Sequence, residues 1–246
     1  RHAAGTVAPM CGRFAASAGP DEYVEVFGID EVVDEPLPSF NIAPTDPVPA
    51  VVERVDRESE QTVRKLVTPR WGLVPSWSKD ATGAARMINA RAETVATKPA
   101  FRKAFAARRC LIPADGYYEW ITQAAGPGAK ALKQPFFLRP ADGGLFVMAG
   151  LYEFWKSPVG EWLTTATIIT TTATDALGHI HDRMPMTVEP DAWASWLDPR
   201  QAEPDAAASL LCVPEGLTAY RVSMLVNRVT NDGPELVAPL ADEPES

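Results

Sequence analysis

The chain has 246 residues, of which 46% are hydrophobic, and this length suits one large domain or two small ones with a sizeable core. No stretch reaches the roughly 18 apolar residues of a membrane-spanning helix, and a net charge of −9 disfavours a protein that coats nucleic acid over its whole surface. We therefore expect no membrane partner. Three scattered cysteines, Cys11, Cys110 and Cys212, make neither a disulfide framework nor a metal site, so we expect no metal, no cofactor and a reducing, cytoplasmic location.

The first half of the chain predicts short elements separated by proline and glycine. Residues 1–9 have no apolar period and are interpreted as an extension before the folded part. A helix is expected from Pro20 to Phe27, because acidic residues in its first turn interact favourably with the helix dipole. The other expected features are a strand at 11–16, an extended proline-rich segment at 36–49, a strand pair at 50–55 and 62–68, an aromatic loop at 71–77 and helix within 92–107.

The second half is richer in strands. Strands are expected at 110–113, 116–121, 136–139, 145–152, 164–172 and 217–222, with a flexible loop at 124–133 and short helices at 191–197 and 206–211. Because strands and helices do not alternate as βαβ units, the pattern predicts the α+β class and not a doubly wound sheet.

Met10 to Phe14, with the sequence Met-Cys-Gly-Arg-Phe, contains the first candidate for chemistry. Removal of Met10 would give Cys11 two nucleophiles, a thiol and an α-amine that titrates near ~7.7–8.0. The amine attacks an aldehyde to give a Schiff base, and the thiol then closes a five-membered ring on the imine. The alternative is that Cys11 is a small buried hydrophobe, the usual fate of a free cysteine.

Two carboxylates lie in segments that favour function. Asn89, Arg91 and Glu93 occupy alternate positions, so an extended backbone would place them on one face. Glu119 lies among aromatic residues, which we expect to desolvate it and raise its pKa toward a useful acid–base range. The alternative in both cases is a solvated face of a strand or helix.

Histidine and tryptophan provide further candidates. His179 and His181 lack a third ligand cluster for a metal, so a general acid or base fits His181 better. Trp71 and Trp77 are core residues in most settings, but beside basic residues such side chains also stack on bases.

Six segments in this order resemble the SRAP family of abasic-site processing proteins. They are residues 10–14, 40–45, 71–77, 88–94, 109–120 and 181–185. The resemblance covers roughly residues 10–240 and leaves 241–246 as an acidic disordered tail. It implies a single α+β domain with a curved, barrel-like mixed β core flanked by short helices.

The resemblance also implies a function. Family members bind single-stranded DNA and capture abasic sites as a covalent thiazolidine through an N-terminal cysteine, which protects the site during the DNA damage (SOS) response. They are also described as peptidase-like, with self-cleavage that exposes this cysteine. The implied partner is single-stranded DNA containing abasic sites, and we expect a cytoplasmic monomer that joins the nucleoid when it is bound to DNA.

Residue by residue, the resemblance assigns Cys11 as the nucleophile. Glu119 would orient the amine and transfer protons, His181 would protonate the sugar oxygen, and Asn89 would hydrogen-bond near them. The DNA contacts it implies are Arg13, Asn41, Trp71, Trp77 and Arg91. Some family members carry a second aromatic residue after the one matched by Trp77, where this chain has Ser78, so we expect weaker stacking there.

Two other functions are compatible with the same residues. One is a cysteine peptidase, with Cys11 as thiolate and His181 as base, which would act without DNA and without a free amine. The other is a non-covalent single-strand-binding module in which Cys11 is incidental.

Overall fold

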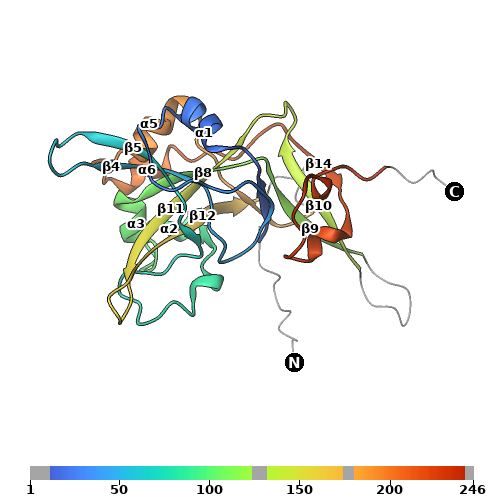
Figure 1. The fold of residues 1–246 in the computed structure, drawn as a ribbon, viewed down its shortest axis with the longest axis horizontal. Coiled ribbons are helices and arrows are strands. Elements are labelled where there is room, and N and C mark those ends of the chain that lie inside the picture. The colour runs from blue at the N-terminus through green and yellow to red at the C-terminus, as the bar shows by residue number, and fades with distance from the viewer. Residues whose placement is uncertain (1–11, 124–131, 174–179, 242–246) are drawn as a thin grey trace.

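Two β-sheets with short helices outside them make up the fold (Figure 1). The computed structural model describes residues 12–123, 132–173 and 180–241. Within these ranges no helix is both long and apolar enough to cross a membrane. In Figure 1, β9, β10 and β14 lie at one end of the molecule and β4 and β5 at the other.

The larger sheet is built around β8 (Arg109–Ala114), whose residues are all buried. A continuous apolar run is typical of a strand covered on both faces. Nine of the described strands belong to this sheet: β13 (Arg183–Pro185), β12 (Trp162–Thr172), β11 (Phe146–Lys156), β8, β4 (Ala50–Val55), β5 (Thr62–Val67) and β2 (Glu31–Val32) in that order, with β6 (Arg70–Trp71) and β7 (Asn89–Arg91) paired to β12.

The smaller sheet begins where the chain turns sharply after β8. Gly116 is required here, because a Cβ at this position would lie only 2.4 Å from the carbonyl oxygen of Leu138 on the neighbouring strand. The five strands assigned to this sheet in the described ranges are β14 (Leu217–Arg221), β10 (Leu132–Pro140), β9 (Gly116–Gln123), β1 (Phe14–Ala16) and β3 (Ser39–Ile42) in that order.

Short helices cover the outside of the larger sheet. The described α-helices are α1 (Pro20–Phe27), α2 (Ala92–Val95), α3 (Arg102–Ala107), α5 (Trp193–Leu197) and α6 (Pro204–Ala208), and the 3₁₀ turns are η1 (Ala84–Arg86), η2 (Pro190–Ala192), η3 (Met224–Asn227) and η4 (Pro234–Leu236). α1 buries Tyr23 and Phe27 and ends at Gly28, whose left-handed backbone (φ 61°) makes it a favourable C-cap.

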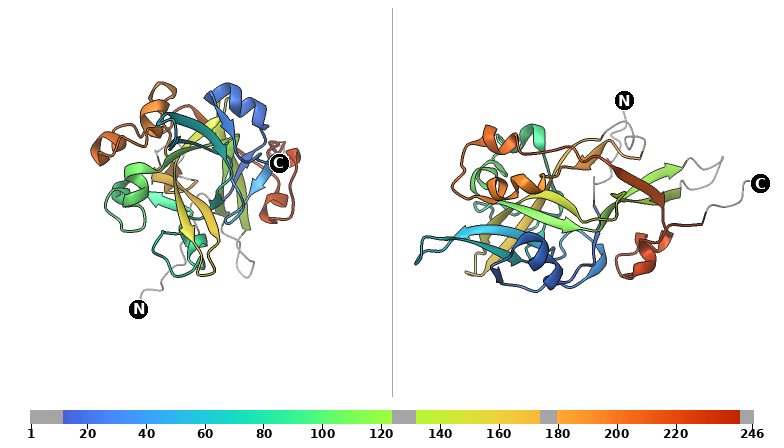
Figure 2. Two further views of the ribbon diagram at one scale, coloured as in Figure 1. Left: turned by 60° about the vertical axis from the view of Figure 1, so that its left-hand side comes forward. Right: turned by 90° about the horizontal axis from the view of Figure 1, so that it is seen from above.

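The core has two main parts, one between the sheets and one beneath the helices. Phe14, Trp71 and Tyr117 belong to the first part, and Phe27, Phe105 and Trp196 belong to the second. Seen end-on, the strands curve around a common centre and the helices lie outside them (Figure 2). The two sheets remain separate and do not close into a barrel.

The predicted α+β class is confirmed, and the helix expected from Pro20 to Phe27 has those bounds. Residues 206–211 were expected to be helical, whereas α6 spans Pro204–Ala208 because the proline begins the helix. Of the loop expected at 124–133, residues 124–131 lie outside the described residues, and β10 already begins at Leu132. Short strands such as β6 and β7 were not predicted, because two or three residues carry no periodicity.

Candidate functional site

A pocket of about 380 Å³ lies where the N-terminal segment, the β9–β10 hairpin and the turn before β13 meet. Its lining consists of Gly12, Arg13, Pro44, Glu119, Trp120, Thr122, Lys133, His181 and Asn227. Arg13, Glu119 and His181, which the sequence indicates separately as site residues, therefore line one pocket. Its volume lies within the range of about 300–1,000 Å³ typical of ligand sites.

Strand pairing brings the N-terminal segment to Glu119. Phe14 on β1 lies opposite Tyr117 on β9, and the Tyr118 N–H donates to the Arg13 carbonyl at 2.9 Å. This ladder holds Gly12 and Arg13 beside the next residue of β9, the buried Glu119. Cys11 is bonded to Gly12 but lies outside the described residues.

Arg13 is held from behind by the protein. Its Nη1 donates to Asn41 Oδ1 at 2.7 Å and to the Val226 carbonyl at 2.8 Å. Burial lowers the pKa of Arg13 from its ordinary value, although a guanidinium remains charged at neutral pH. Since a guanidinium has five N–H donors, Arg13 keeps others for a ligand in the pocket.

Asn41 does not lie where a DNA contact was expected. It is buried on β3, and its Nδ2 donates to the carbonyls of Arg228 and Asn231 at 3.0 and 2.8 Å. Its Oδ1 accepts from Arg13. The side chain therefore ties the segment after η3 to β3 and orients Arg13, and we correct its expected role from DNA contact to positioning.

His181 is fixed by the turn that precedes β13. Its Nδ1 accepts from the backbone N–H of Arg183 at 3.1 Å and lies 3.0 Å from Asp182 Oδ1. An imidazole whose Nδ1 accepts a hydrogen bond carries its proton on Nε2 when neutral. This turn therefore presents a histidine that can donate through Nε2, or donate through Nδ1 to Asp182 when it is protonated.

Arg183 connects this turn to the segment after β7. Its guanidinium donates to both carboxylate oxygens of Glu93 and, at 2.6 Å, to the carbonyl of Thr170. The hydrogen bonds and charge of Arg183 hold the pKa of Glu93 below its ordinary value. The pair joins two segments of the predicted motif set that are far apart in sequence.

Asn89, Arg91 and Glu93 do not share one face as expected. β7 ends at Arg91 and α2 begins at Ala92, so the extended alternation stops before Glu93. Asn89 is half-buried on β7, and it is not among the described residues that line the pocket. Arg91 is exposed at the end of the strand.

The two tryptophans have different environments. Trp71 is fully buried, its Nε1 donates to the Ile88 carbonyl at 2.9 Å, and its ring packs edge-on against Phe14. It cannot stack on a base in this position, and the expected DNA contact is wrong because burial in the core removes its face from solvent. Trp77 is 62% exposed, so its ring is accessible for stacking on a ligand.

Several pocket residues were missed by sequence reasoning. Trp120 Nε1 donates to Asn227 Oδ1 at 2.7 Å, which closes the pocket with a residue from η3. Lys133 lies opposite Thr122 across the β9–β10 pairing and adds a cation. Thr122 is three residues from Glu119 on β9, so the alternation of strand faces would have placed it on the opposite face, and nothing local indicated Asn227.

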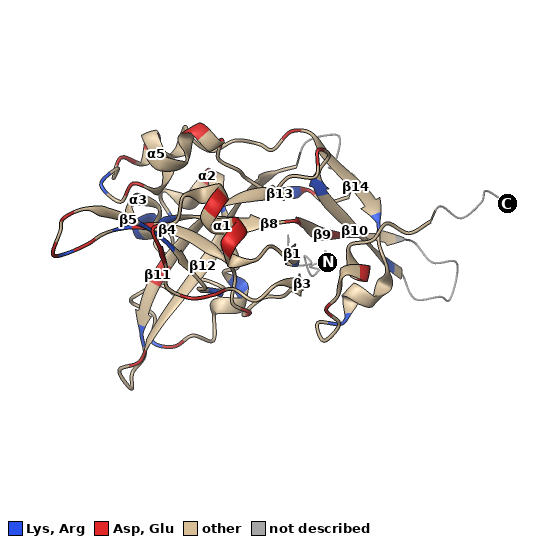
Figure 3. Ribbon diagram, turned by 45° about the horizontal axis from the view of Figure 1, so that its top comes forward, with Lys and Arg blue, Asp and Glu red and all other residues tan. Residues whose placement is uncertain are grey.

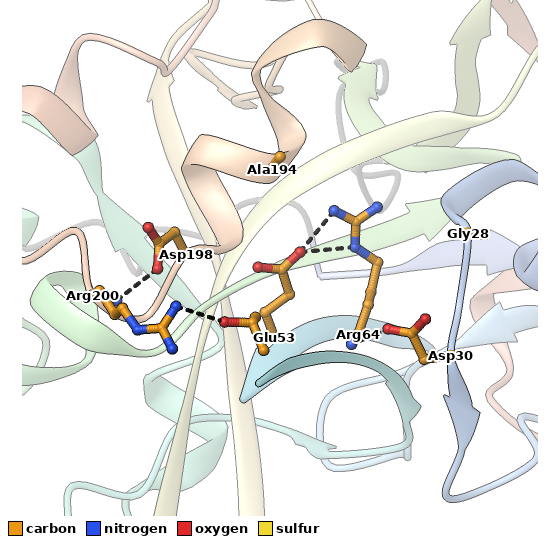
Figure 4. A pocket seen from close by; sticks show the side chains of 8 residues that line it. Gly28, Asp30, Glu53, Arg64, Ala194, Asp198 and Arg200 are labelled. Atoms are coloured by element: carbon orange, nitrogen blue, oxygen red, sulfur yellow. Dashed lines mark hydrogen bonds and ion pairs between the residues drawn. The ribbon is translucent and has the colours of Figure 1, made fainter. Parts of the chain in front are cut away.

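Two other parts of the surface are less suited to DNA. Figure 3 shows acidic segments on α1, whose first turn contains Asp21 and Glu22. A hollow of about 310 Å³ near Gly28 contains charged residues that already bond to the protein (Figure 4). There Arg64 donates to Glu53 through Nε and Nη2, and Arg200 donates to Thr62 Oγ1. We interpret the charged residues of this hollow as stabilising the fold and not as binding a ligand.

Metal-ligating clusters and the buried Cys110 are the remaining features of the described residues that bear on chemistry. No group of three His, Cys, Asp or Glu residues in this part is placed to hold a metal ion. Cys110 is buried, and burial raises the pKa of its thiol, so it stays protonated and inert. His179, the neighbour of His181 in the expected histidine pair, lies outside the described residues.

Comparisons with known proteins place these features in a family. The family described as SOS response associated peptidase (SRAP) matches residues 10–229. The abasic site processing protein YoqW of Bacillus subtilis is 40% identical over 232 residues, which cover 93% of this chain and 99% of YoqW. The abasic site processing protein HMCES of Gallus gallus is 33% identical over 229 residues, covering 82% of this chain and 66% of HMCES.

Solved structures share the fold. A protein from Bacteroides thetaiotaomicron superposes with a TM-score of 0.77 at 26% identity, covering 94% of this chain and all of that protein. A phage-related protein from Bordetella bronchiseptica superposes with a TM-score of 0.67 at 27% identity, covering 86% of this chain and 94% of that protein.

Proposed function

The chain belongs to the SRAP family, and from this membership we propose that it captures abasic sites in single-stranded DNA as a covalent thiazolidine through Cys11. Relatives that bear the name abasic site processing protein support the processing of abasic sites as its general role. The covalent link, the preference for a single strand and the use of an N-terminal cysteine are the finer parts of the proposal.

One observation carries it: Gly12, the residue bonded to Cys11, lines the same pocket as Glu119 and His181. A carboxylate and an imidazole are the two groups that proton transfer to and from an amine and a sugar oxygen requires. Arg13 supplies a cation at the same place. The acid–base groups that the proposal assigns to capture therefore lie in one pocket.

The reaction balances within these groups. The closed abasic sugar opens to an aldehyde, and the α-amine of Cys11 condenses with it to give an imine and one water molecule. The thiol of Cys11 then adds to the imine carbon, its proton passes to the nitrogen, and the thiazolidine ring is complete. The step requires a free amine, so residues 1–10 must be removed before capture.

Glu119 and His181 have separate tasks in this scheme. Glu119 accepts protons from the amine during capture. His181 protonates the sugar oxygen during ring opening and the leaving group during release. Its Nδ1 accepts a hydrogen bond from the Arg183 N–H, so Nε2 is the nitrogen that donates the proton.

The strand itself is held by charge and stacking. Arg13 in the pocket and the exposed Arg91 are the cations proposed to contact phosphates, and the exposed Trp77 is proposed to stack on a base. Asn89, half-buried on β7 beside β12, is retained as a hydrogen-bonding residue near the site.

The test is trapping of a labelled abasic oligonucleotide in a denaturing gel. Protein that begins at Cys11 should give a band that survives denaturant, and Cys11→Ala should give none. Cys11→Ser keeps the amine and should give at most a labile Schiff base. Cys212→Ser is the matched control, since it removes a partly exposed thiol elsewhere and should trap DNA like the unchanged protein. Retention of the strand only in native gels would show the non-covalent binding module instead.

Self-processing is a second proposed activity, because the family description includes the word peptidase. Hydrolysis of the Met10–Cys11 bond consumes one water and releases the amine that capture requires. The full chain should lose residues 1–10 on incubation, as measured by intact mass spectrometry. Glu119→Gln should slow the loss, and an equal rate in both proteins would contradict a role for Glu119 in it.

A further inference from the structure

We propose that a second pocket, lined by Arg54, Arg70 and Trp162, binds a nucleotide of the DNA strand next to the captured site. Its volume is about 400 Å³, and it lies between the start of β12, the β4 strand and the loop before β6. The phosphate would contact the two arginines and the base would stack on Trp162. The inference rests on the proposed function, because it takes DNA as the ligand.

The two arginines are cations that form no ion pair with a described residue. In the described ranges neither Arg54 nor Arg70 belongs to an ion pair, in contrast to Arg64, Arg108 and Arg183. The Nε atoms of Arg54 and Arg70 are buried without a hydrogen-bond partner, as are those of Arg108 and Arg183, but Arg108 and Arg183 also form ion pairs. Arg54 and Arg70 therefore differ from the other two in having no carboxylate that neutralises their charge, which leaves that charge available to a phosphate.

Strand geometry directs both arginines to this side of the sheet. Arg54 stacks over the Tyr152 and Phe154 rings at 5.4 and 4.8 Å from their centroids, which fixes its guanidinium. Arg70 precedes Trp71 on β6, and since Trp71 points into the core, Arg70 points away from it. Arginine forks held in this way match the oxygens of a phosphate.

Trp162 completes the pocket with an exposed aromatic face. Its side chain is 68% exposed at the start of β12, where a core role cannot explain a tryptophan. Lys156 lies opposite it on β11, with Nζ at 5.7 Å from the ring centroid. An exposed aromatic ring flanked by cations is the arrangement that binds single-stranded nucleic acid without sequence preference.

The second pocket adjoins the first along the chain. Pro44 lines the pocket of Glu119 and His181, and Thr45, the next residue, lines this one. Thr45 has a φ of 79°, rare for a β-branched residue, and its N–H donates to the Trp71 carbonyl at 2.8 Å. This loop therefore contributes neighbouring residues to both pockets.

The positive charge of the pocket would suit either nucleic acid or an acidic protein, and the exposed aromatic ring favours nucleic acid. Asp34 also lines the pocket, but its Oδ2 accepts from the backbone N–H of Thr68. With Lys156 nearby the balance is positive, in a chain whose net charge is −9. An acidic peptide would use the cations and leave the tryptophan face without a partner.

The experiment measures binding of an intact, fluorescently labelled single strand by anisotropy at several salt concentrations. Trp162→Ala should weaken binding by roughly 5- to 150-fold, the range expected for loss of one stacked base. Arg54→Gln and Arg70→Gln should each reduce the slope of log K against log salt by about 0.7. Arg57→Gln is the control, because it removes an exposed arginine from the turn of the same β4–β5 hairpin.

A second arm separates this inference from the proposed function. The same variants should still trap an abasic oligonucleotide that is too short to reach the second pocket. A strand carrying 5-iododeoxyuridine should photocrosslink to Trp162, located by peptide mapping. The second pocket would be overturned, with covalent capture left intact, by any of three results. These are unchanged affinity in all three variants, a loss of affinity in Arg57→Gln equal to theirs, or crosslinks confined to other residues. Displacement of the strand by polyglutamate from the unchanged protein and from Trp162→Ala, but not from Arg54→Gln, would assign the pocket to an acidic partner and overturn it as well.

Discussion

The ion pair between Glu93 and Arg183 offers the sharpest test of how the site is held. Substitution Glu93→Gln keeps the shape of the side chain but removes its charge. Arg183 is 8% exposed, whereas the Glu93 side chain is 47% exposed. A hydrogen bond to a charged group contributes about 1.5–3 kcal/mol and an exposed pair about 0.2–1 kcal/mol, so we expect a loss of about 1–2 kcal/mol after discounting for solvent at Glu93.

Urea unfolding at neutral pH measures this loss directly, and a decrease in Tm of about 2–8 °C should accompany it for a chain of this size. Because Arg183 lowers the pKa of Glu93 in the folded state, the contribution is complete above the unfolded pKa of ~4.3. It is lost as the pH falls through the lower folded pKa. The unfolding curves of the two proteins should therefore converge in acid.

Glu31→Gln provides the matched control. Glu31 pairs with Lys65 at 2.6 Å and is 51% exposed, close to the value for Glu93, but Lys65 is less buried than Arg183. We expect Glu31→Gln to leave the stability unchanged within error. The argument from a buried cation fails if both variants lose the same stability, or if the Glu93→Gln loss persists in acid.

Three further predictions concern buried residues and the site. Trp71→Phe should lower the free energy of unfolding while Trp77→Ala should not, and Trp77→Ala should weaken single-strand binding by roughly 1–3 kcal/mol, as measured by urea unfolding and anisotropy. Cys110 should resist iodoacetamide in the native protein and react only after denaturation, as mapped by peptide mass spectrometry. Glu119→Gln should slow adduct formation most and His181→Ala should slow release most, each by ~10²–10⁴-fold in single-turnover assays, and equal effects on both steps would refute the division of roles.

Local patterns were sufficient for some elements of the fold. The helix from Pro20 to Phe27 was predictable because its proline, its acidic first turn and its C-terminal glycine are all signals within the segment. The long strands β11 and β12 were predictable from their β-branched and aromatic content. β6 and β7 were not, because such short strands exist only through pairing with β12.

The sequence by itself determined the α+β class and the family, because the order of motifs along the chain can be recognised without knowledge of contacts. It also supplied the residues that we propose for the chemistry. The tertiary structure decided which of those residues share a pocket, because β1 pairs with β9 and the turn before β13 lies beside them. It also decided that Trp71 is core while Trp77 is exposed, and that Asn41 supports Arg13 from behind. Burial depends on packing between segments distant in the chain, and no local pattern of residues contains that information.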